Sequence, residues 1–199
     1  MSFKKTLELT LQKLAVSQSL SNYLEQYQTD GKTASYILNI AFLDGNIEGK
    51  SIIDMGTGNG IFAIGAKLLG ASEVTAIDID QKQIDISLEN AKKLGLNINF
   101  LKCDVNKISG QYDTCIMNPP FGSVKTHSDL PFIEKACSIS RKVYAIHNYK
   151  TREFVLNKYS ERGMSELTWE KIKIGINHTY PHHTKDRVMI DCIFIRAYK

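Results

Sequence analysis

The chain has 199 residues, of which 43% are hydrophobic and 23% charged; this composition is ordinary for one globular domain and excludes disorder and collagen-like structure. No apolar run reaches the roughly 18 residues of a membrane-spanning helix, and no Cys-x-x-Cys pair occurs, which favours the reducing cytoplasm over a disulfide framework or zinc ribbon. The net charge is only +4, but residues 141–199 carry 12 basic and 6 acidic side chains, which fits either an anionic partner such as nucleic acid or a solvated basic face.

Two helices are predicted before the first strand. Leucines recur at helical spacing between residues 7 and 14, which predicts a helix from residue 4 to about residue 16. A polar segment with two tyrosines follows, and we expect it to be an ordered loop. A second helix then carries an apolar face over residues 34–42, with Thr29 or Asp30 as its N-cap.

From residue 51 onward, short apolar runs that predict strands alternate with segments that predict helices. The expected strands are 51–55, 73–79, 98–102, 112–117, 142–147, 167–176 and 187–197, and the expected helices are 61–69, 82–94, 131–140 and 151–162. Only a loop joins the last two strands, so they form a C-terminal antiparallel hairpin. The sum is an α/β fold with a mostly parallel seven-stranded sheet covered by helices on both faces, which is typical of Rossmann-like class I methyltransferases.

A glycine-rich turn follows the first predicted strand, with the sequence Asp54-Met55-Gly56-Thr57-Gly58-Asn59-Gly60. Glycines allow a tight turn and a close approach of a ligand to the backbone, and the helix start behind them favours a carboxylate or phosphate. The dinucleotide pattern Gly-x-Gly-x-x-Gly fails from Gly56, because its sixth position is Ile61, and fits only loosely from Gly58. Asp54 suits the ammonium group of a methionine moiety and would repel a pyrophosphate. The segment therefore favours S-adenosylmethionine (SAM) over a dinucleotide, and a turn without a ligand is the remaining interpretation.

Acidic residues also end the next two predicted strands. Asp78 lies 24 residues after Asp54 and is suited to accept hydrogen bonds from both ribose hydroxyls, whereas Asp80 is suited to cap the next helix. Asp104 is either a turn residue or an acceptor for the adenine amino group, with the backbone N–H of Val105 beside it. Because the carboxyl ends of parallel strands share one sheet edge, we expect the three acids to line one cofactor site.

The fourth predicted strand is followed by Asn118-Pro119-Pro120-Phe121. An exocyclic amino group on a base is a poor nucleophile, because its lone pair is delocalised into the ring. The oxygens of the Asn118 side chain and the Pro119 backbone can accept from that group and aim its lone pair at a methyl group, and Phe121 can stack on a flipped-out base. Proline stiffens the turn. The motif predicts amino-group methylation by positioning, and the alternative is a proline-rich loop that merely ends a strand.

The two motifs together resemble the amino-group branch of class I SAM methyltransferases. Leu24-Glu25-Gln26-Tyr27-Gln28-Thr29 further resembles the Leu-Glu-Gln-Tyr-Pro-Thr segment of the methyltransferase-like family that makes N6-methyladenosine in small-subunit ribosomal RNA (rRNA). Other matching segments are Asp78-Ile79-Asp80, Cys103-Asp104-Val105, Ile116 through Gly122, His147 with Thr151-Arg152-Glu153, and Asp191 with Ile195-Arg196. The chain departs from the family at Gln28, at Met55 and Thr57, and over residues 123–129.

The resemblance implies one SAM-dependent methyltransferase domain over residues 1–199, with residues 1–45 as a helical N-terminal extension that folds over the cofactor. It implies contacts to SAM from Gln26, Thr29, Gly56, Asn59, Ile61, Asp78, Asp104 and Val105, to which the loop adds Asp54, Gly58 and Gly60. It also implies that Asn118, Pro119, Pro120 and Phe121 hold the adenine.

The substrate implied by the resemblance is structured RNA, and eukaryotic members work with a small zinc-binding activator subunit. Lys150, Thr151 and Arg152 follow the fifth predicted strand and are suited to bind RNA phosphates, or they are incidental to a helix start. We expect no metal in this chain, because His178, His182 and His183 are better explained as a solvated RNA-facing loop than as ligands. Trp169 is expected to pack in the core or against the sheet.

Two alternatives to adenine-N6 methylation stay open. Asn-Pro-Pro-aromatic motifs also serve guanine-N2 methylation and methylation of a glutamine side chain in release factors, although only 50 residues precede the first predicted strand, which is short for the helical domain of glutamine enzymes. The other alternative is a non-catalytic RNA-binding or ribosome assembly factor, against which the intact set of motifs argues.

Overall fold

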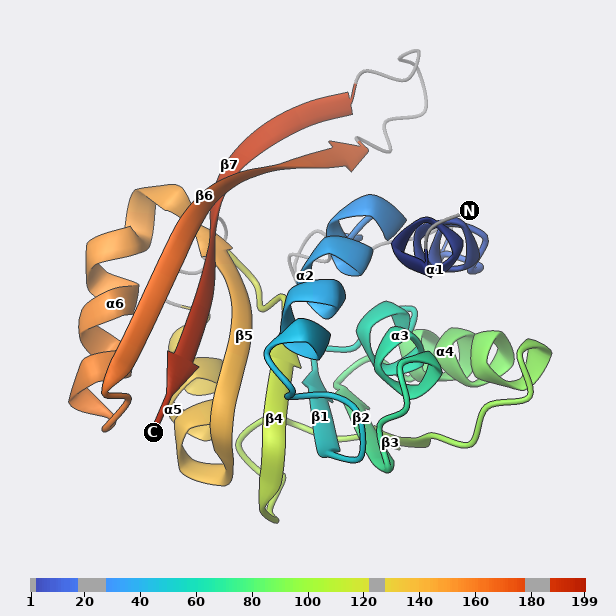
Figure 1. The fold of residues 1–199 in the computed structure, drawn as a ribbon, viewed down its shortest axis with the longest axis horizontal. Helices are drawn as coiled ribbons and strands as arrows, with labels where there is room; N and C mark the ends of the chain where they lie inside the picture. The colour runs from blue at the N-terminus through green and yellow to red at the C-terminus, as the bar shows by residue number, and fades with distance from the viewer. Residues whose placement is uncertain (1–2, 18–27, 122–127, 178–186) are drawn as a thin grey trace.

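The computed structural model describes residues 3–17, 28–121, 128–177 and 187–199 (Figure 1). Two helices come first, α1 (Phe3–Gln12) and α2 (Gly31–Leu43). The alternating part contains β1 (Ser51–Met55), α3 (Ile61–Leu68), β2 (Glu73–Asp78), α4 (Gln81–Lys93), β3 (Asn99–Lys102), β4 (Tyr112–Met117), α5 (Leu130–Ile139), β5 (Ser140–Asn148), the 3-10 turn η1 (Tyr149–Thr151) and α6 (Arg152–Glu161). The long strands β6 (Glu166–Asn177) and β7 (Arg187–Tyr198) end the chain.

The described strands form one seven-stranded sheet in the order β3-β2-β1-β4-β5-β7-β6. The pairs from β3 to β5 are parallel, and β7 runs antiparallel to both β5 and β6. The predicted sheet and terminal hairpin are therefore confirmed. The chain moves outward from β1 through β2 to β3 and then returns to place β4 on the other side of β1. Ligands of such sheets bind beyond the strand ends at this reversal.

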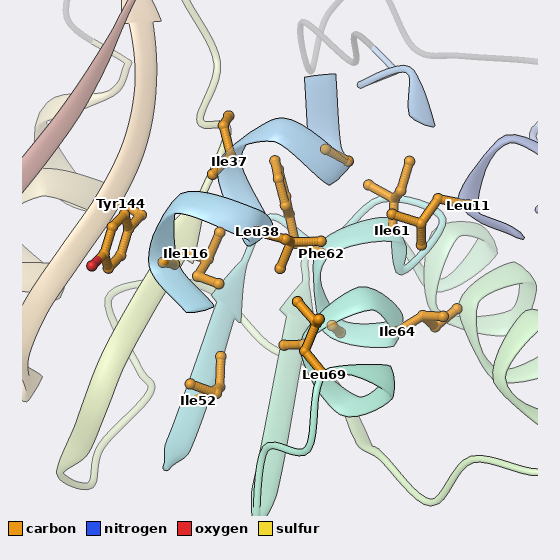
Figure 2. Close-up of a cluster of buried hydrophobic side chains, with 14 of the residues drawn as sticks. Leu11, Ile37, Leu38, Ile52, Ile61, Phe62, Ile64, Leu69, Ile116 and Tyr144 are labelled. Carbon is orange, nitrogen blue, oxygen red and sulfur yellow. The ribbon is translucent and has the colours of Figure 1, made fainter. Parts of the chain in front are cut away.

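Each face of the sheet is covered by its own helices. On one face, α1, α2 and α3 pack over Ile52, Ile116 and Tyr144, and Figure 2 shows Leu38 of α2 and Phe62 of α3 meeting above the sheet. On the other face, α5 and α6 enclose a second apolar cluster that includes alternate residues of the same strands. Because β1 is buried on both faces, its residues 52–55 are all buried, and its apolar residues do not alternate with exposed polar ones.

The first helix ends four residues earlier than the leucine spacing predicts. Side chains from two other segments capture the backbone of Ala15: its N–H donates to Asn90 Oδ1 at 2.8 Å, and its carbonyl accepts from Asn90 Nδ2 at 3.0 Å and from Asn59 Nδ2 at 3.2 Å. A helical residue could not form this pattern, so the chain leaves the helix there. The second helix begins as predicted, with Asp30 accepting from the N–H of Thr33.

Of the two placements expected for Trp169, in the core or against the sheet, the core is wrong. This residue lies on β6, an edge strand, and 43% of its surface is exposed. Leu167, two residues earlier on the same face, packs against the cluster below α6, but α6 begins only at Arg152, whose guanidinium lies 5.2 Å from the centre of the Trp169 ring. The helix therefore starts too late to cover the indole.

Candidate active site

Asp54 is the last residue but one of β1, and its side chain links this strand to the first turn of α3. It is fully buried, and its Oδ2 accepts from the Thr57 hydroxyl at 2.6 Å and from the N–H of Ala63 at 3.0 Å. Its Oδ1 is also buried and has no hydrogen-bond partner among the described residues. Burial raises the pKa of Asp54 to about 7, although both hydrogen bonds oppose the rise. A buried acceptor without a partner is suited to a ligand that brings a donor, such as an ammonium group.

The three glycines of the turn have positive φ angles, but two of them serve different purposes. At Gly58, with φ of 55°, an added Cβ would meet nothing within 4 Å, so the backbone faces open space that a ligand can occupy. At Gly60, with φ of 86°, an added Cβ would lie 3.0 Å from Cβ of Ser87 on α4. The missing side chain of Gly60 thus allows the turn to pack closely on α4, and the missing side chain of Gly58 leaves the space next to the turn open.

Asp78 ends β2 beside this turn. Its Oδ2 accepts from the N–H of Gly58 at 2.9 Å and its Oδ1 from the N–H of Asp80 at 3.0 Å, while burial raises its pKa. The carboxylate therefore holds the glycine turn in place, a role that the ribose prediction did not include. Asp80 is confirmed as the N-cap of α4, since it accepts from the N–H of Lys82.

The third acid follows β3, the outer strand on this side. Asp104 Oδ1 accepts from the N–H of Asn106 at 2.8 Å and from its side-chain amide at 3.0 Å, and Val105 is buried in the cluster with Ile77. The structure thus brings the three predicted acids to neighbouring strand ends in the order β3-β2-β1. Asn59 lies in the glycine turn and Ile61 begins α3, and both are buried. Gln26 lies outside the described residues.

Asn118 directly follows β4, next to β1 in the sheet. Its Nδ2 donates to the hydroxyl of Thr29 at 2.9 Å, and its Oδ1 is buried without a hydrogen-bond partner among the described residues. Thr29 is itself buried and comes just before the N-cap of α2. The contact fixes the direction of the amide, so that its oxygen is the atom left for an incoming donor. This pairing joins residues that are 89 positions apart, and the sequence offered no signal for it.

The other residues of the motif line the turn after β4. Pro119 is buried and Pro120 half-buried. Phe121 is only 7% exposed and packs in the cluster on the α2–α3 side, so its ring is a core side chain as well as the predicted stacking surface. Stacking on a base stays a prediction.

One residue that matches the family, but for which the sequence suggested no role, is a buried histidine on the strand next to β4. His147, at the end of β5, is fully buried; its Nδ1 lies 2.9 Å from Asp129 Oδ2 and its Nε2 3.1 Å from the hydroxyl of Tyr159. Burial raises the pKa of Tyr159, so its hydroxyl stays protonated. In the tautomer with its proton on Nδ1, the His147 ring donates to Asp129 and accepts from this hydroxyl at Nε2. A polar residue ending the apolar run 143–146 was the available signal.

The three residues predicted to bind RNA phosphates lie at the same sheet edge, in and after η1. Lys150 is exposed, whereas the hydroxyl of Thr151 donates to the backbone of Asn148 at 3.1 Å. Arg152 donates to the hydroxyl of Tyr149 at 2.8 Å and pairs with Glu153. The three predicted loop histidines, 178, 182 and 183, lie outside the described residues.

Metal ligands, membrane-spanning helices and disulfides were also considered from the sequence. Within the described ranges, no group of three metal-ligating side chains is found, and no helix is long and apolar enough to cross a membrane. All four cysteines are free thiols, and three of them are buried.

The sequence is similar to known methyltransferases. Residues 31–119 match the family described as ribosomal protein L11 methyltransferase (PrmA). The rRNA N(6)-adenosine-methyltransferase METTL5 of Danio rerio is 33% identical over 96% of this chain and 97% of its own length. Protein MJ0284 of Methanocaldococcus jannaschii, which is uncharacterized, is 35% identical over 98% of this chain and 94% of its own.

A solved structure is also similar over the full length. PH1948 from Pyrococcus horikoshii, described as a candidate RNA methyltransferase, superposes with a TM-score of 0.90 and is 36% identical, covering 100% of this chain and 98% of that one. The likeness therefore extends over both the glycine turn and the residues after β4.

Proposed function

This chain belongs to the METTL5 family of rRNA N6-adenosine methyltransferases, and on that premise we propose that it methylates the exocyclic N6 of an adenine in small-subunit rRNA. It is a methyltransferase, and its cofactor is SAM. The choice of the small subunit and of structured RNA as the substrate belongs to the proposal. So does a small zinc-binding activator subunit, which the family resemblance suggests, and a cytoplasmic location.

The observation that carries the proposal is the orientation of Asn118. Its amide nitrogen donates to the Thr29 hydroxyl, and its amide oxygen is buried without a donor among the described residues. A buried polar atom without a partner costs about 1–3 kcal/mol, so a ligand that brings an N–H to this oxygen removes a penalty as it binds. The amino group of adenine is such a donor.

The chemistry then follows from positioning. Bound SAM supplies a methyl group made electrophilic by its positively charged sulfur. Asn118 Oδ1 and the Pro119 carbonyl accept from the N6 hydrogens, localise the nitrogen lone pair and direct it toward the methyl carbon. The N–C bond would form as the bond between the methyl carbon and the SAM sulfur breaks, with S-adenosylhomocysteine as the leaving group. The two oxygens would stabilise the positive charge that develops on N6 until one N6 proton passes to water.

The turn after β1 fits the methionine end of SAM. Oδ1 of Asp54 has no partner in the described part of the chain and matches an ammonium donor, and an added Cβ on Gly58 of the same turn would meet only open space. Asp78 stands at the next strand end, where a carboxylate suits ribose hydroxyls. These features support SAM contacts at Asp54, Gly56, Gly58, Asn59, Gly60, Ile61, Asp78, Asp104 and Val105 as a proposal, together with Thr29 and Gln26.

The experiment is methyl transfer from labelled SAM to unmethylated ribosomal subunits, to naked rRNA and, in a parallel reaction, to release factors, followed by digestion and identification of the methylated products by mass spectrometry. We expect N6-methyladenosine, with label in the small subunit. Methylated guanine would move the target base, and label in release factors would move the substrate to protein. Tight SAM binding with no labelled product, even with an activator subunit added, would contradict the proposal and favour an assembly factor.

A further inference from the structure

Four aromatic and cationic side chains gather where η1, the start of α6 and β6 meet. The guanidinium of Arg152 lies 5.1 Å from the ring centre of Tyr149 and 5.2 Å from that of Trp169, and Lys171 Nζ lies 4.3 Å from the ring centre of Tyr149. We call Tyr149, Arg152, Trp169 and Lys171 the aromatic–cation cluster. Its members come from two segments that are about 20 residues apart in the chain, so the fold assembles it.

The cluster lies at the surface. Trp169 is 43% exposed, the side chain of Lys171 is 45% exposed, and Lys150 beside the cluster is exposed. A large aromatic side chain left open among cations is informative, because exposed tryptophan is uncommon and an indole face offers a stacking surface. The ion pair of Lys171 with Asp191 is also open to solvent, so a phosphate can compete for this lysine.

The register of the sheet places Trp169 three strands away from the residue that precedes Asn118, at the same height along the sheet. Met117, the residue before Asn118, pairs with Ala145, which pairs with Ile195, which pairs with Trp169. Neighbouring strands are about 4.8 Å apart, so the Trp169 backbone lies roughly 14 Å from the end of β4, at the same height along the sheet. Residues paired in this way point to the same face, so the indole lies on the side of α5 and α6.

We propose that the aromatic–cation cluster binds an unpaired nucleotide that flanks the target adenine. The base stacks on Trp169, which Arg152 holds in place, while Lys150 and Lys171 contact neighbouring phosphates. Stacking on aromatic rings tolerates any base and is how single-stranded RNA is held, whereas lysines position the backbone. The inference rests on the proposed function for the choice of RNA, and it adds a subsite that selects unpaired nucleotides.

The experiment uses the fluorescence of Trp169, which is the only tryptophan in the chain. A short unstructured RNA is titrated into the full-length protein in the presence of S-adenosylhomocysteine. We expect saturable quenching, because a stacked base quenches the indole. Trp169→Ala should weaken RNA binding, measured with labelled RNA, about tenfold, whereas Trp169→Phe keeps an aromatic ring and should keep most of the affinity.

A matched control lies outside the cluster, on the paired strands β5 and β7. Lys142 Nζ lies 4.4 Å from the ring centre of Tyr198, three register positions from the row that contains Trp169, so Lys142→Ala removes a similar cation–aromatic contact. Lys171→Ala should weaken RNA binding several-fold and Lys142→Ala should not. The dissociation constant of SAM should be the same in all variants, which shows that they are folded.

The outcomes separate this inference from the proposed function. If the wild type methylates rRNA but Trp169→Ala leaves the KM for RNA unchanged and RNA does not quench the indole, the subsite is wrong and the enzyme assignment stands. If the wild type methylates no RNA but the quenching and the tenfold loss are found, RNA binding stands without the activity. Quenching by a protein partner in place of RNA would overturn the subsite.

Discussion

Two parts of the sheet edge at which the site residues lie are built in different ways. The cofactor end is the turn 54–60 with Asp78, and the target end is Asn118 with the residues that follow it. At the cofactor end, the carboxylates of Asp54 and Asp78 bind backbone and hydroxyl groups no more than 20 positions away, all between residues 54 and 80. At the target end, Asn118 binds Thr29 from a distant segment, and His147 joins three elements. The two carboxylates of the cofactor end are therefore held by one stretch of chain, although Asn59 in the same turn also donates to the carbonyl of Ala15, whereas the acceptor of the target end is oriented by the N-terminal segment.

Both ends nevertheless share one feature. Each contains a buried oxygen without a described partner, Asp54 Oδ1 at the cofactor end and Asn118 Oδ1 at the target end. One carries a carboxylate charge when ionised and suits an ammonium group, and the other is neutral and suits an amino group. If this comparison is right, substitutions at the cofactor end should change the affinity for SAM, and substitutions at the target end should change the rate of methyl transfer.

The largest expected effect comes from removing the acceptor at the target end. Asn118→Ala should lower the rate of methyl transfer to rRNA by about 10²–10³-fold, because it removes an oxygen that stabilises the charge developing on N6. The dissociation constant of SAM, measured by calorimetry, should stay the same. An equal loss of SAM binding and transfer would contradict the division between the two ends.

The next effect concerns pH and the cofactor end. The pKa of Asp54 rises from 3.8 to about 7, which corresponds to about 4 kcal/mol of penalty for burying the charge. Since the unfolded chain ionises first, this group lowers the free energy of unfolding as pH rises from about 4 to 7, and its contribution then levels off.

Asp54→Asn is the matched variant, because an amide can accept from Thr57 and Ala63 without carrying a charge. Without ligand, urea unfolding should show that the variant gains stability relative to the wild type by several kcal/mol between pH 4 and pH 7. A difference between the two proteins that does not change with pH would show that Asp54 is not held in a charge-excluding site.

A smaller effect is expected at the buried histidine. His147→Leu leaves the Asp129 carboxylate without its partner, and the free energy of unfolding should fall by about 2–4 kcal/mol. Tyr159→Phe, which removes only one hydroxyl from the same network, should lower it by about 1 kcal/mol. Unchanged denaturation midpoints in both variants would show that this network does not stabilise the target end.

The smallest predicted loss is in SAM affinity. Asp78→Ala should weaken SAM binding by about 1–3 kcal/mol, because it removes charge-assisted hydrogen bonds and also releases the N–H of Gly58. Transfer at saturating SAM should be nearly unchanged. Asp80→Ala is the control. It removes the hydrogen bond at 3.0 Å from the N–H of Lys82 to Asp80 Oδ1, which caps α4, and it should leave the dissociation constant of SAM unaltered.

The features predicted from the sequence are those that depend on residues close together in the chain. The strand–helix alternation predicted the sheet, and the run 54–60 with Asp78 predicted the cofactor end, because those contacts lie within one βαβ unit. The contact of Asn118 with Thr29 was not predictable, since nothing in either local sequence specifies a partner 89 residues away. The exposure of Trp169 was missed because strand order, and hence which strand is an edge, does not follow from alternation alone.

The most direct test of the central claim is a crystal structure with a bisubstrate compound in which the SAM scaffold is joined to N6 of adenosine. We predict that Asn118 Oδ1 lies about 2.7–3.2 Å from that nitrogen while the amide still contacts Thr29. If Asn118 instead turns away from N6 or binds the methionine moiety, the assignment of Asn118 to the target amino group is wrong.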